Sequence, residues 1–219
     1  MSYFDEYRIT SPYGWRTLSG RREFHTGIDL AKHHEAPIYA FTGGTVIFAG
    51  FGQPGSGFGG YGNVVAIRDK YGALHCYCHL HSYIVQVGEE VEKGKMIGRQ
   101  GNTGKVVPQP TPANPAAGSH LHYEIRKTSS PKYGWIADRE NNCYDPAEYL
   151  INYYAKEKAA SGKFADVPRG HWAEASINKA AGSGILSGVT ENKFGVGEPV
   201  TREQLAVVLD RLGLLERSK

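Results

Sequence analysis

The sequence has few cysteines, no long apolar run and no strong excess of charge. Its three cysteines, Cys76, Cys78 and Cys143, are odd in number, and the first two are too close together for an unstrained disulfide, so no disulfide framework is expected. No window approaches about 18 consecutive apolar residues, which excludes a membrane-spanning helix. The net charge is only +3, so charge gives no reason to expect a nucleic-acid partner.

The first residues of the sequence do not predict a signal peptide. These residues, Met-Ser-Tyr-Phe-Asp-Glu-Tyr-Arg, contain neither a basic segment nor an apolar one. The unpaired thiols indicate folding in a reducing compartment. The sequence therefore predicts synthesis in the cytoplasm, and a role elsewhere would need another route of release. A chain from which a leader had been removed would look the same.

The abundant residues are those of a β-rich, turn-rich protein, with 28 glycines and 14 tyrosines in 219 residues. Residues 63–67 and 74–80 predict a hairpin of two strands. Residues 37–50 predict two strands around a Gly-Gly turn, and residues 84–98 predict further short strands. We therefore expect a mainly β domain over residues 1–154.

The C-terminal part of the chain changes to a helical pattern. Asp145 is a predicted N-cap for a helix that starts at Pro146 and fades into an Ala-Ala-Ser-Gly stretch. Thr201 is a second predicted N-cap, with a glutamine at the capping-box position. We expect a linker at 155–163 and a small helical module at 164–219. Such a module is marginal for an independent core, which favours packing against further copies.

Residues 119–125 predict another strand, which follows a proline-rich loop at residues 105–118. Side chains two residues apart in a strand point to the same face, so His120 and His122 would lie side by side with Glu124 next in the row. A His-x-His pair alone is a weak signal. Two interpretations of Glu124 stay open: it supports a neighbouring histidine, or it is a solvated strand residue.

His25 and Asp29 are two further candidate metal ligands. Gly27 and Ile28 between them argue against a helix, and a straight strand would place the two roughly 13 Å apart. They can share one ion only if the chain bends, and Gly27 is the natural place for a bend. Taken alone, a surface histidine and a turn aspartate are the commoner explanation.

The second strand of the predicted hairpin alternates in polarity. His75, Tyr77 and His79 are predicted to share one face, which would be the polar, working face. Cys76 and Cys78 are predicted to lie on the other face as small buried apolar residues. A cysteine metal site is disfavoured because the chain has no second thiol pair.

Two histidines, one carboxylate and a spare histidine are the residue types of a catalytic zinc site, in which three protein ligands leave a position for water. Zinc polarises a carbonyl and lowers the pKa of its bound water, and the remaining histidines can transfer protons. The sequence contains neither His-Glu-x-x-His, nor the zinc deaminase signature, nor Gly-x-Ser-x-Gly, so none of these motifs supports another mechanism.

Seven segments between residues 8 and 126 occur in a characteristic order: Ile9-Thr-Ser-Pro-Tyr-Gly-Trp-Arg16, His25-x-x-x-Asp29, Gly60-Tyr-Gly-Asn-Val-Val65, Tyr77-Cys-His-Leu80, Val87-Gly-Glu-Glu-Val-Glu-Lys-Gly-Lys-Met-Ile-Gly98, Gly101-Asn-Thr-Gly104 and His120-Leu-His-Tyr-Glu-Ile-Arg126. Together they resemble the lysostaphin/LytM-type zinc endopeptidases of bacterial cell walls. The resemblance implies a compact, mostly antiparallel β fold with the site in a groove on the sheet.

The resemblance also implies a role for each candidate residue. His25, Asp29 and His122 would hold one zinc ion, whereas His120 and His79 would be the catalytic histidines, acting as general base and as stabiliser of the tetrahedral intermediate. All five positions of the family are filled, which argues against an inactive relative. The proline-rich loop is longer than in many relatives and would lie at the groove edge. Four other histidines match no ligand position and are expected at the surface or rim: His33, His34, His75 and His81.

Four segments in the C-terminal part form a second pattern: Phe164-Ala-Asp-Val167, His171-Trp-Ala173, Gly184-Ile-Leu-Ser-Gly188 and Thr201-Arg-Glu-Gln204. Residues 164–212 thereby resemble a single S-layer homology module. Such modules bind secondary cell-wall polysaccharides, which are often anionic. Arg202 at a helix N-terminus suits an anion, and Trp172 would either stack on a sugar or pack in the core. Most such proteins carry three modules, so one copy points to self-association.

The two resemblances together imply a modular peptidoglycan hydrolase that cleaves a peptide bond in the stem or cross-link peptides. With the N-terminus described above, we expect a bacteriophage or prophage endolysin that reaches the wall through holin-type membrane holes. Two alternatives stay open: a non-hydrolytic wall-binding or amidase-activating protein, and a zinc hydrolase of free peptides. D-Ala–diaminopimelate, D-Ala–Gly and Gly–Gly bonds all fit such a site.

Overall fold

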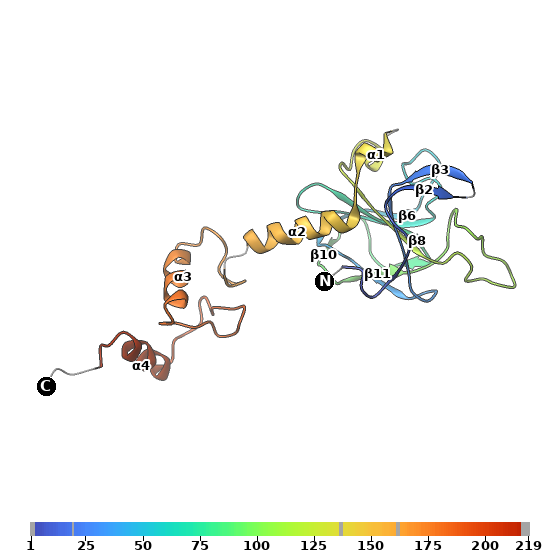
Figure 1. Cartoon of the computed structure of the whole chain (residues 1–219). Coiled ribbons are helices and arrows are strands. Elements are labelled where there is room, and N and C mark those ends of the chain that lie inside the picture. The colour runs from blue at the N-terminus through green and yellow to red at the C-terminus, as the bar shows by residue number, and fades with distance from the viewer. Residues whose placement is uncertain (1–2, 19, 136–137, 161–162, 216–219) are drawn as a thin grey trace. The chain divides into compact units, whose positions relative to one another are not determined.

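The computed structural model of the chain describes residues 3–18, 20–135, 138–160 and 163–215. The chain divides into two compact units, Met1–Leu150 and Ile151–Lys219. Antiparallel strands build the first unit, and helices dominate the second (Figure 1). The prediction of a mainly β domain is confirmed. The predicted domain boundaries stay a prediction.

The main sheet of the described residues has eight strands, and every paired strand is antiparallel to its neighbour. In spatial order they are β1 (Arg8–Ser11), β4 (Gly27–Ala31), β12 (Leu121–Arg126), β8 (Leu74–Leu80), β7 (Asn63–Arg68), β6 (Gly44–Phe51) and β10 (Glu90–Val91), while β13 (Cys143–Tyr144) pairs with β12. The His-x-His strand β12 thus lies between β4 and β8. This position brings together residues that are far apart in the sequence.

Among the described residues, the first unit also contains two small sheets, two short helical turns and the start of a longer helix. The smaller sheets are β2 (Gly14–Leu18) with β3 (Arg21–His25), and β5 (Pro37–Tyr39) with β11 (Met96–Arg99) and β9 (Ser82–Tyr83). The turns are η1 (Lys132–Gly134) and α1 (Arg139–Asn142).

Residues 37–50 contain the two predicted strands, β5 before the Gly-Gly pair and β6 from Gly44 onward, but the two strands do not pair with each other. β5 pairs with β11, whereas β6 pairs with β7 and β10, so the two segments belong to different sheets. The sequence analysis assigned no partner to either strand, because nothing in the local sequence identifies β11 as the partner of β5. By contrast, the hairpin of β7 and β8 is confirmed.

The two faces of the main sheet carry different cores. Cys76 and Cys78 lie fully buried on one face with Phe58, and all three cysteines are free thiols. Tyr77 and Tyr123 lie on the other face, where their rings pack at 5.0 Å between centroids. The prediction that the cysteines are small buried apolar residues is confirmed. Because Cys78 is the cross-strand partner of His122, however, the cysteine face is also the face of the His-x-His strand that carries the candidate ligand.

A β-bulge in β8 explains how His79 reaches that same face. Asn63 pairs with Leu80 and Val65 pairs with Tyr77, so the register shifts by one residue between the two pairs. His79 has a φ of +60°, which is uncommon for a residue other than glycine. The prediction that His75 and His79 share a face is therefore wrong, because alternation holds only in a regular strand.

His75 stays on the opposite face and is fully buried there. Its Nδ1 lies 2.6 Å from the Tyr123 hydroxyl and its Nε2 lies 3.1 Å from Asp69 Oδ2. The expectation of a surface or rim position is wrong for this histidine, which is a hydrogen-bonded core residue.

Helix α2 (Pro146–Ala160) begins in the first unit and ends in the second, so residues 155–160 of the predicted linker are helical. Asp145 accepts hydrogen bonds from the N–H groups of Ala147 and Glu148 at 2.8 and 3.3 Å, which confirms the predicted N-cap. Residues 161–162 of the linker lie outside the described residues. No helix of the described ranges is long and apolar enough to cross a membrane.

The second unit also contains α3 (Glu174–Gly182) and α4 (Arg202–Arg211). Thr201 caps α4 and forms a capping box with Gln204, as predicted. A small buried cluster, Phe164, Val167 and Ile177, holds the unit together. No residue of α4 is buried in it.

Candidate metal centre and catalytic groove

The chain passes from one sheet to another within a few residues, and this change of direction brings the candidate ligands together. His25 ends β3 in the two-stranded sheet, and Gly27 begins β4 in the main sheet. The bend falls at Thr26 and Gly27, close to where it was expected. A Cβ atom on Gly27 would lie 2.4 Å from the carbonyl oxygen of Tyr123 and 2.9 Å from the His122 ring, so only glycine fits there. Asp29 then lies directly across from His122 in the β4–β12 register.

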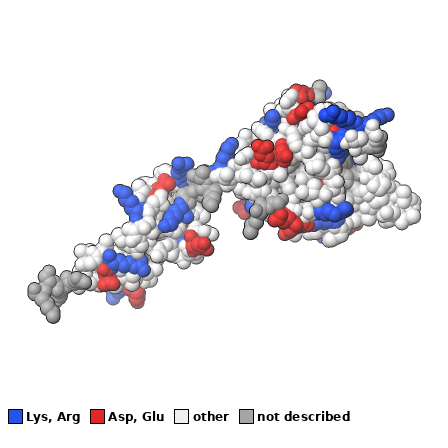
Figure 2. Space-filling view, in the orientation of Figure 1, with Lys and Arg blue, Asp and Glu red and all other residues white. Residues whose placement is uncertain are grey.

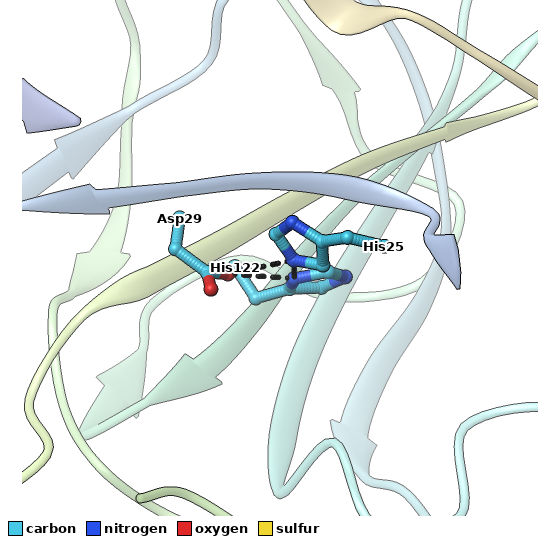
Figure 3. A group of neighbouring side chains, drawn as sticks. All are labelled: His25, Asp29 and His122. Atoms are coloured by element: carbon cyan, nitrogen blue, oxygen red, sulfur yellow. Dashed lines mark hydrogen bonds and ion pairs between the residues drawn. The ribbon is translucent and has the colours of Figure 1, made fainter. Parts of the chain in front are cut away.

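Three donor atoms converge at this point (Figure 3). His25 Nε2 lies 3.1 Å from Asp29 Oδ1 and 3.1 Å from His122 Nδ1, and His122 Nδ1 lies 2.9 Å from Asp29 Oδ1. Two ligands of a tetrahedral zinc ion with bonds of about 2.0–2.1 Å are roughly 3.3 Å apart. The donor set and its spacing therefore fit one such ion.

Each ligand has a second polar atom that points away from the site and lies within hydrogen-bonding distance of another group. This contact determines which atom is left to bind a metal. His25 Nδ1 lies 2.7 Å from the carbonyl oxygen of Pro12, to which it can donate, leaving the Nε2 lone pair for a metal. Arg16 Nη1 donates to Asp29 Oδ2 at 3.2 Å, so Oδ1 alone faces the histidines. Burial opposes ionisation of Asp29, but hydrogen bonds from His122 and His25 outweigh it and hold the pKa of the carboxyl below its usual range.

Glu124 is fully buried beside His122, which answers the question left open by the sequence. Its Oε2 lies 3.3 Å from His122 Nε2 and accepts a hydrogen bond from the Tyr61 hydroxyl at 2.9 Å. Arg126, also buried, donates from Nε to Glu124 Oε1 at 2.5 Å. Burial opposes the charge on Glu124, yet Arg126 and His122 hold the pKa of this carboxyl well below its usual range. An ionised Glu124 can therefore orient the His122 ring.

His79 and His120 form a neighbouring pair whose ring centroids are 4.9 Å apart. His79 Nδ1 lies 2.8 Å from the carbonyl oxygen of Thr103, and His120 Nδ1 lies 2.8 Å from that of Gly118. Each Nδ1 can thus donate its proton to a carbonyl, which leaves Nε2 as an acceptor. Burial lowers the pKa of both rings, and for His79 the charges of His120 and His122 add to this effect and bring its pKa to about 3. Both rings are therefore neutral at neutral pH.

The model of peptidase family M23 matches residues 23–133, just over half of the chain. The chain belongs to peptidase family M23. The matched range contains His25, Asp29, His79, His120 and His122. A second family model, that of the S-layer homology domain, matches residues 163–206.

Known relatives match part of the chain. The chain is 31% identical over 138 residues to a lipoprotein NlpD/LppB homolog of Pseudomonas aeruginosa, which is 61% of this chain and 37% of the relative. It is 29% identical over 156 residues to the peptidoglycan DD-endopeptidase ShyA of Vibrio cholerae serotype O1, which is 70% of this chain and 33% of the relative. The chain thus spans about a third of the length of these relatives.

The fold agrees with a solved structure of the same type. The catalytic domain of lysostaphin from Staphylococcus simulans superposes with a TM-score of 0.51 at 26% sequence identity, covering 68% of this chain and 96% of that domain. The resemblance found in the sequence and its antiparallel β fold are therefore confirmed.

The candidate ligands and the histidine pair of the M23 unit line one groove of about 900 Å³. The proline-rich loop forms part of its wall through residues 105–108, and Asn102 Nδ2 donates to the carbonyl oxygens of Pro115 and Ala117 at 2.8 Å each. Residues 106–119 carry no charge. The loop extends at the right of Figure 1, and the corresponding end of the molecule is free of blue and red atoms in Figure 2.

Sequence reasoning did not single out Tyr61 and Arg139, which also line the groove. Arg139 Nη2 donates to the Thr26 hydroxyl and to the Tyr61 hydroxyl, both at 3.0 Å. Tyr61 lies in the segment Gly60–Val65 that carried part of the resemblance, so that segment was the available signal. Arg139 lies beyond every matched segment and had none.

The two candidate wall-binding residues belong to the second unit. Trp172 is 91% exposed, so the alternative that it packs in the core is wrong. Arg202 is exposed at the first position of α4.

Proposed function

We propose that this protein hydrolyses a peptide bond in the stem or cross-link peptides of peptidoglycan. The observation that carries the proposal is the convergence of His25 Nε2, Asp29 Oδ1 and His122 Nδ1 beside the pair of His79 and His120 in one groove. The name of the relative ShyA, a peptidoglycan DD-endopeptidase, supports a peptide bond of the cell wall as the target.

One zinc ion held by the three ligands would polarise the scissile carbonyl and lower the pKa of a water molecule. The chain supplies the proton transfer. His120 Nε2 lies 3.6 Å from Asp29 Oδ1, next to the ligand set, so it is placed to accept the proton of the attacking water. His79 holds the same tautomer on the other side of the pair, and the water proton, passed on from His120, would make His79 Nε2 a donor to the tetrahedral intermediate and then to the leaving amine.

Digestion of purified sacculi tests this proposal. The wild-type chain with one bound zinc ion is expected to release new amino groups, and mass spectrometry of the fragments identifies the bond. A D-Ala–diaminopimelate bond is the first candidate, with D-Ala–Gly and Gly–Gly bonds as the others. Zinc binding without any release of amino groups would instead support the non-hydrolytic, wall-binding or amidase-activating alternative. Cleavage of soluble peptides in preference to sacculi would support a hydrolase of free peptides.

For the second unit we propose binding to an anionic secondary cell-wall polymer. The match to the S-layer homology domain, the exposed ring of Trp172 and the cation of Arg202 at a helix N-terminus support this function. Sedimentation with walls before and after removal of the polymer tests it, with Trp172→Ala and Arg202→Gln expected to weaken binding. Self-association through this unit is part of the proposal, and analytical ultracentrifugation of the full chain tests it.

A lytic role as a bacteriophage endolysin is the biological setting that we propose for this pair of units. A hydrolase that carries its own wall-binding unit can act on the wall after release through membrane holes. Addition of the purified chain to intact Gram-positive cells tests the lytic activity. A chain that cleaves sacculi but never lyses cells would argue for wall remodelling instead.

A further inference from the structure

A second group of metal-ligating side chains lies outside the catalytic set. His34, Glu35 and His81 place one donor atom each within 4.8 Å of the others. Glu35 Oε1 lies 3.8 Å from His34 Nε2 and 3.7 Å from His81 Nε2, so one carboxylate oxygen stands between two imidazoles. The two rings meet edge to face, with centroids 5.5 Å apart. Neither the proposed reaction nor the M23 ligand set uses any of the three.

The donor atoms of this group are available to an ion. His34 Nδ1 lies 2.9 Å from the Ser119 hydroxyl, which leaves Nε2 toward Glu35. Arg99 is a neighbouring cation, but it donates to the backbone carbonyl of Glu35 at 3.0 Å and not to the carboxylate. The side chains of His34, Glu35 and His81 are 24%, 50% and 46% exposed, so an ion and its waters can reach them.

We propose that His34, Glu35 and His81 bind a second divalent transition-metal ion of the zinc class. Two imidazoles and one carboxylate suit zinc, copper or nickel, whereas magnesium and calcium prefer oxygen ligands alone. Three protein ligands leave a position for water, as in an open zinc site.

This ion binds more weakly than the ion at His25, Asp29 and His122. Glu35 Oε1 lies 3.7–3.8 Å from the two Nε2 atoms, and the three donor atoms must approach to about 3.3 Å around a tetrahedral ion, at a cost in side-chain conformational entropy. The catalytic set is already at 2.9–3.1 Å and is held by buried hydrogen bonds.

The second ion would join segments that carry the catalytic histidines. His81 follows His79 by two residues, and Ser119, the partner of His34, directly precedes His120. Binding therefore ties residues 34–35 to the end of β8 and to the entry of β12. A rise in thermal stability with added zinc, beyond the rise caused by the first ion, follows from this cross-link.

Zinc titration of the full chain, purified with its first ion, tests the proposal. The wild type is expected to bind a second ion, and Glu35→Gln and His81→Ala are expected to weaken that step by more than about tenfold while the first ion stays bound. His33→Ala is the matched control, because His33 is adjacent in the sequence but outside the group. Magnesium is expected not to compete.

Two outcomes would overturn the proposal: a wild-type chain that stops at one ion in millimolar zinc, or variants that bind the second ion as the wild type does. A His79→Ala chain distinguishes binding at the catalytic pair, since loss of the second ion there but not in Glu35→Gln would also contradict the proposal. Because the readout is metal bound and the melting temperature, failure here leaves the proposed hydrolysis untouched.

Discussion

Two clusters of the first unit contain the same residue types, two histidines and one carboxylate, but differ in how they are supported. In the cluster of His25, Asp29 and His122, the polar atom of each side chain that points away from the metal position lies within hydrogen-bonding distance of another group. The three atoms that would bind the metal are about 3 Å apart. In the cluster of His34, Glu35 and His81, the side chains are more exposed and the spacing is wider. The residue types make a cluster a candidate; the buried hydrogen bonds make it a preformed site.

We call the cluster of His25, Asp29 and His122 the inner cluster, and the cluster of His34, Glu35 and His81 the outer cluster. The largest expected effect comes from a change in the inner cluster. His122→Ala is expected to abolish both zinc retention and hydrolysis of sacculi, since it removes one of three ligands. Metal analysis after gel filtration and release of amino groups measure the two effects. His33→Ala is expected to keep both. A His122→Ala chain that digests sacculi at the wild-type rate would sink the assignment of this ligand.

His79→Ala separates metal binding from catalysis. We expect the variant to keep one zinc ion and to lose about 10²–10⁴-fold in rate, because proton transfer and not coordination is removed. Zinc content and initial rates on sacculi provide the comparison. An unchanged turnover would remove His79 from the mechanism, and loss of zinc would make it a ligand.

Arg16→Gln tests whether outer hydrogen bonds create the preformed site. Arg16 holds Asp29 Oδ2, so its loss is expected to weaken zinc binding by about ten- to hundredfold while the fold is kept. Competition with a chelator measures the affinity, and Arg21→Gln on the same hairpin serves as the control. Equal affinities in the two variants would show that the inner cluster needs no such support.

His75 is a buried histidine that belongs to neither cluster. Burial lowers its pKa, although the Asp69 carboxylate raises it; its other titratable neighbours are Tyr123 and Tyr149. The unfolded chain takes up this proton below about pH 6.5 whereas the folded chain resists it, so stability falls as the pH drops below that value, by up to about 1.4 kcal/mol per pH unit.

The pKa of Asp69 is also held below its usual range, because hydrogen bonds from His75 and Tyr149 outweigh the effect of burial, and it adds a loss of stability in the same direction at lower pH. His75→Gln is expected to flatten the change in unfolding free energy between pH 7 and pH 5. Urea unfolding at the two pH values measures it. An equally steep change in the variant would place the titrating group elsewhere.

Much of the site was predictable because short segments carried it. The His-x-His strand, the bend near Gly27 and the burial of the cysteines all follow from local spacing and residue type. The bulge at His79 was not predictable, since it arises from how β8 pairs with β7. The same holds for Glu124, whose burial depends on Arg126 and on the Tyr61 hydroxyl from a distant loop.

The exposure of the Trp172 ring is another feature that the sequence alone could not predict. An aromatic residue at helical spacing is usually a core residue, and the small core of the second unit instead uses Phe164, Val167 and Ile177. Sequence alone does not decide which of several apolar residues a small module buries.

The central claim is that the inner cluster holds the catalytic ion, and a zinc anomalous-difference map from crystals of the full chain tests it most directly. We predict the strongest peak at about 2.0–2.1 Å from His25 Nε2, Asp29 Oδ1 and His122 Nδ1. A weaker peak at His34, Glu35 and His81 is expected only at high zinc. A strongest peak at the outer cluster, or between His79 and His120, would contradict the account.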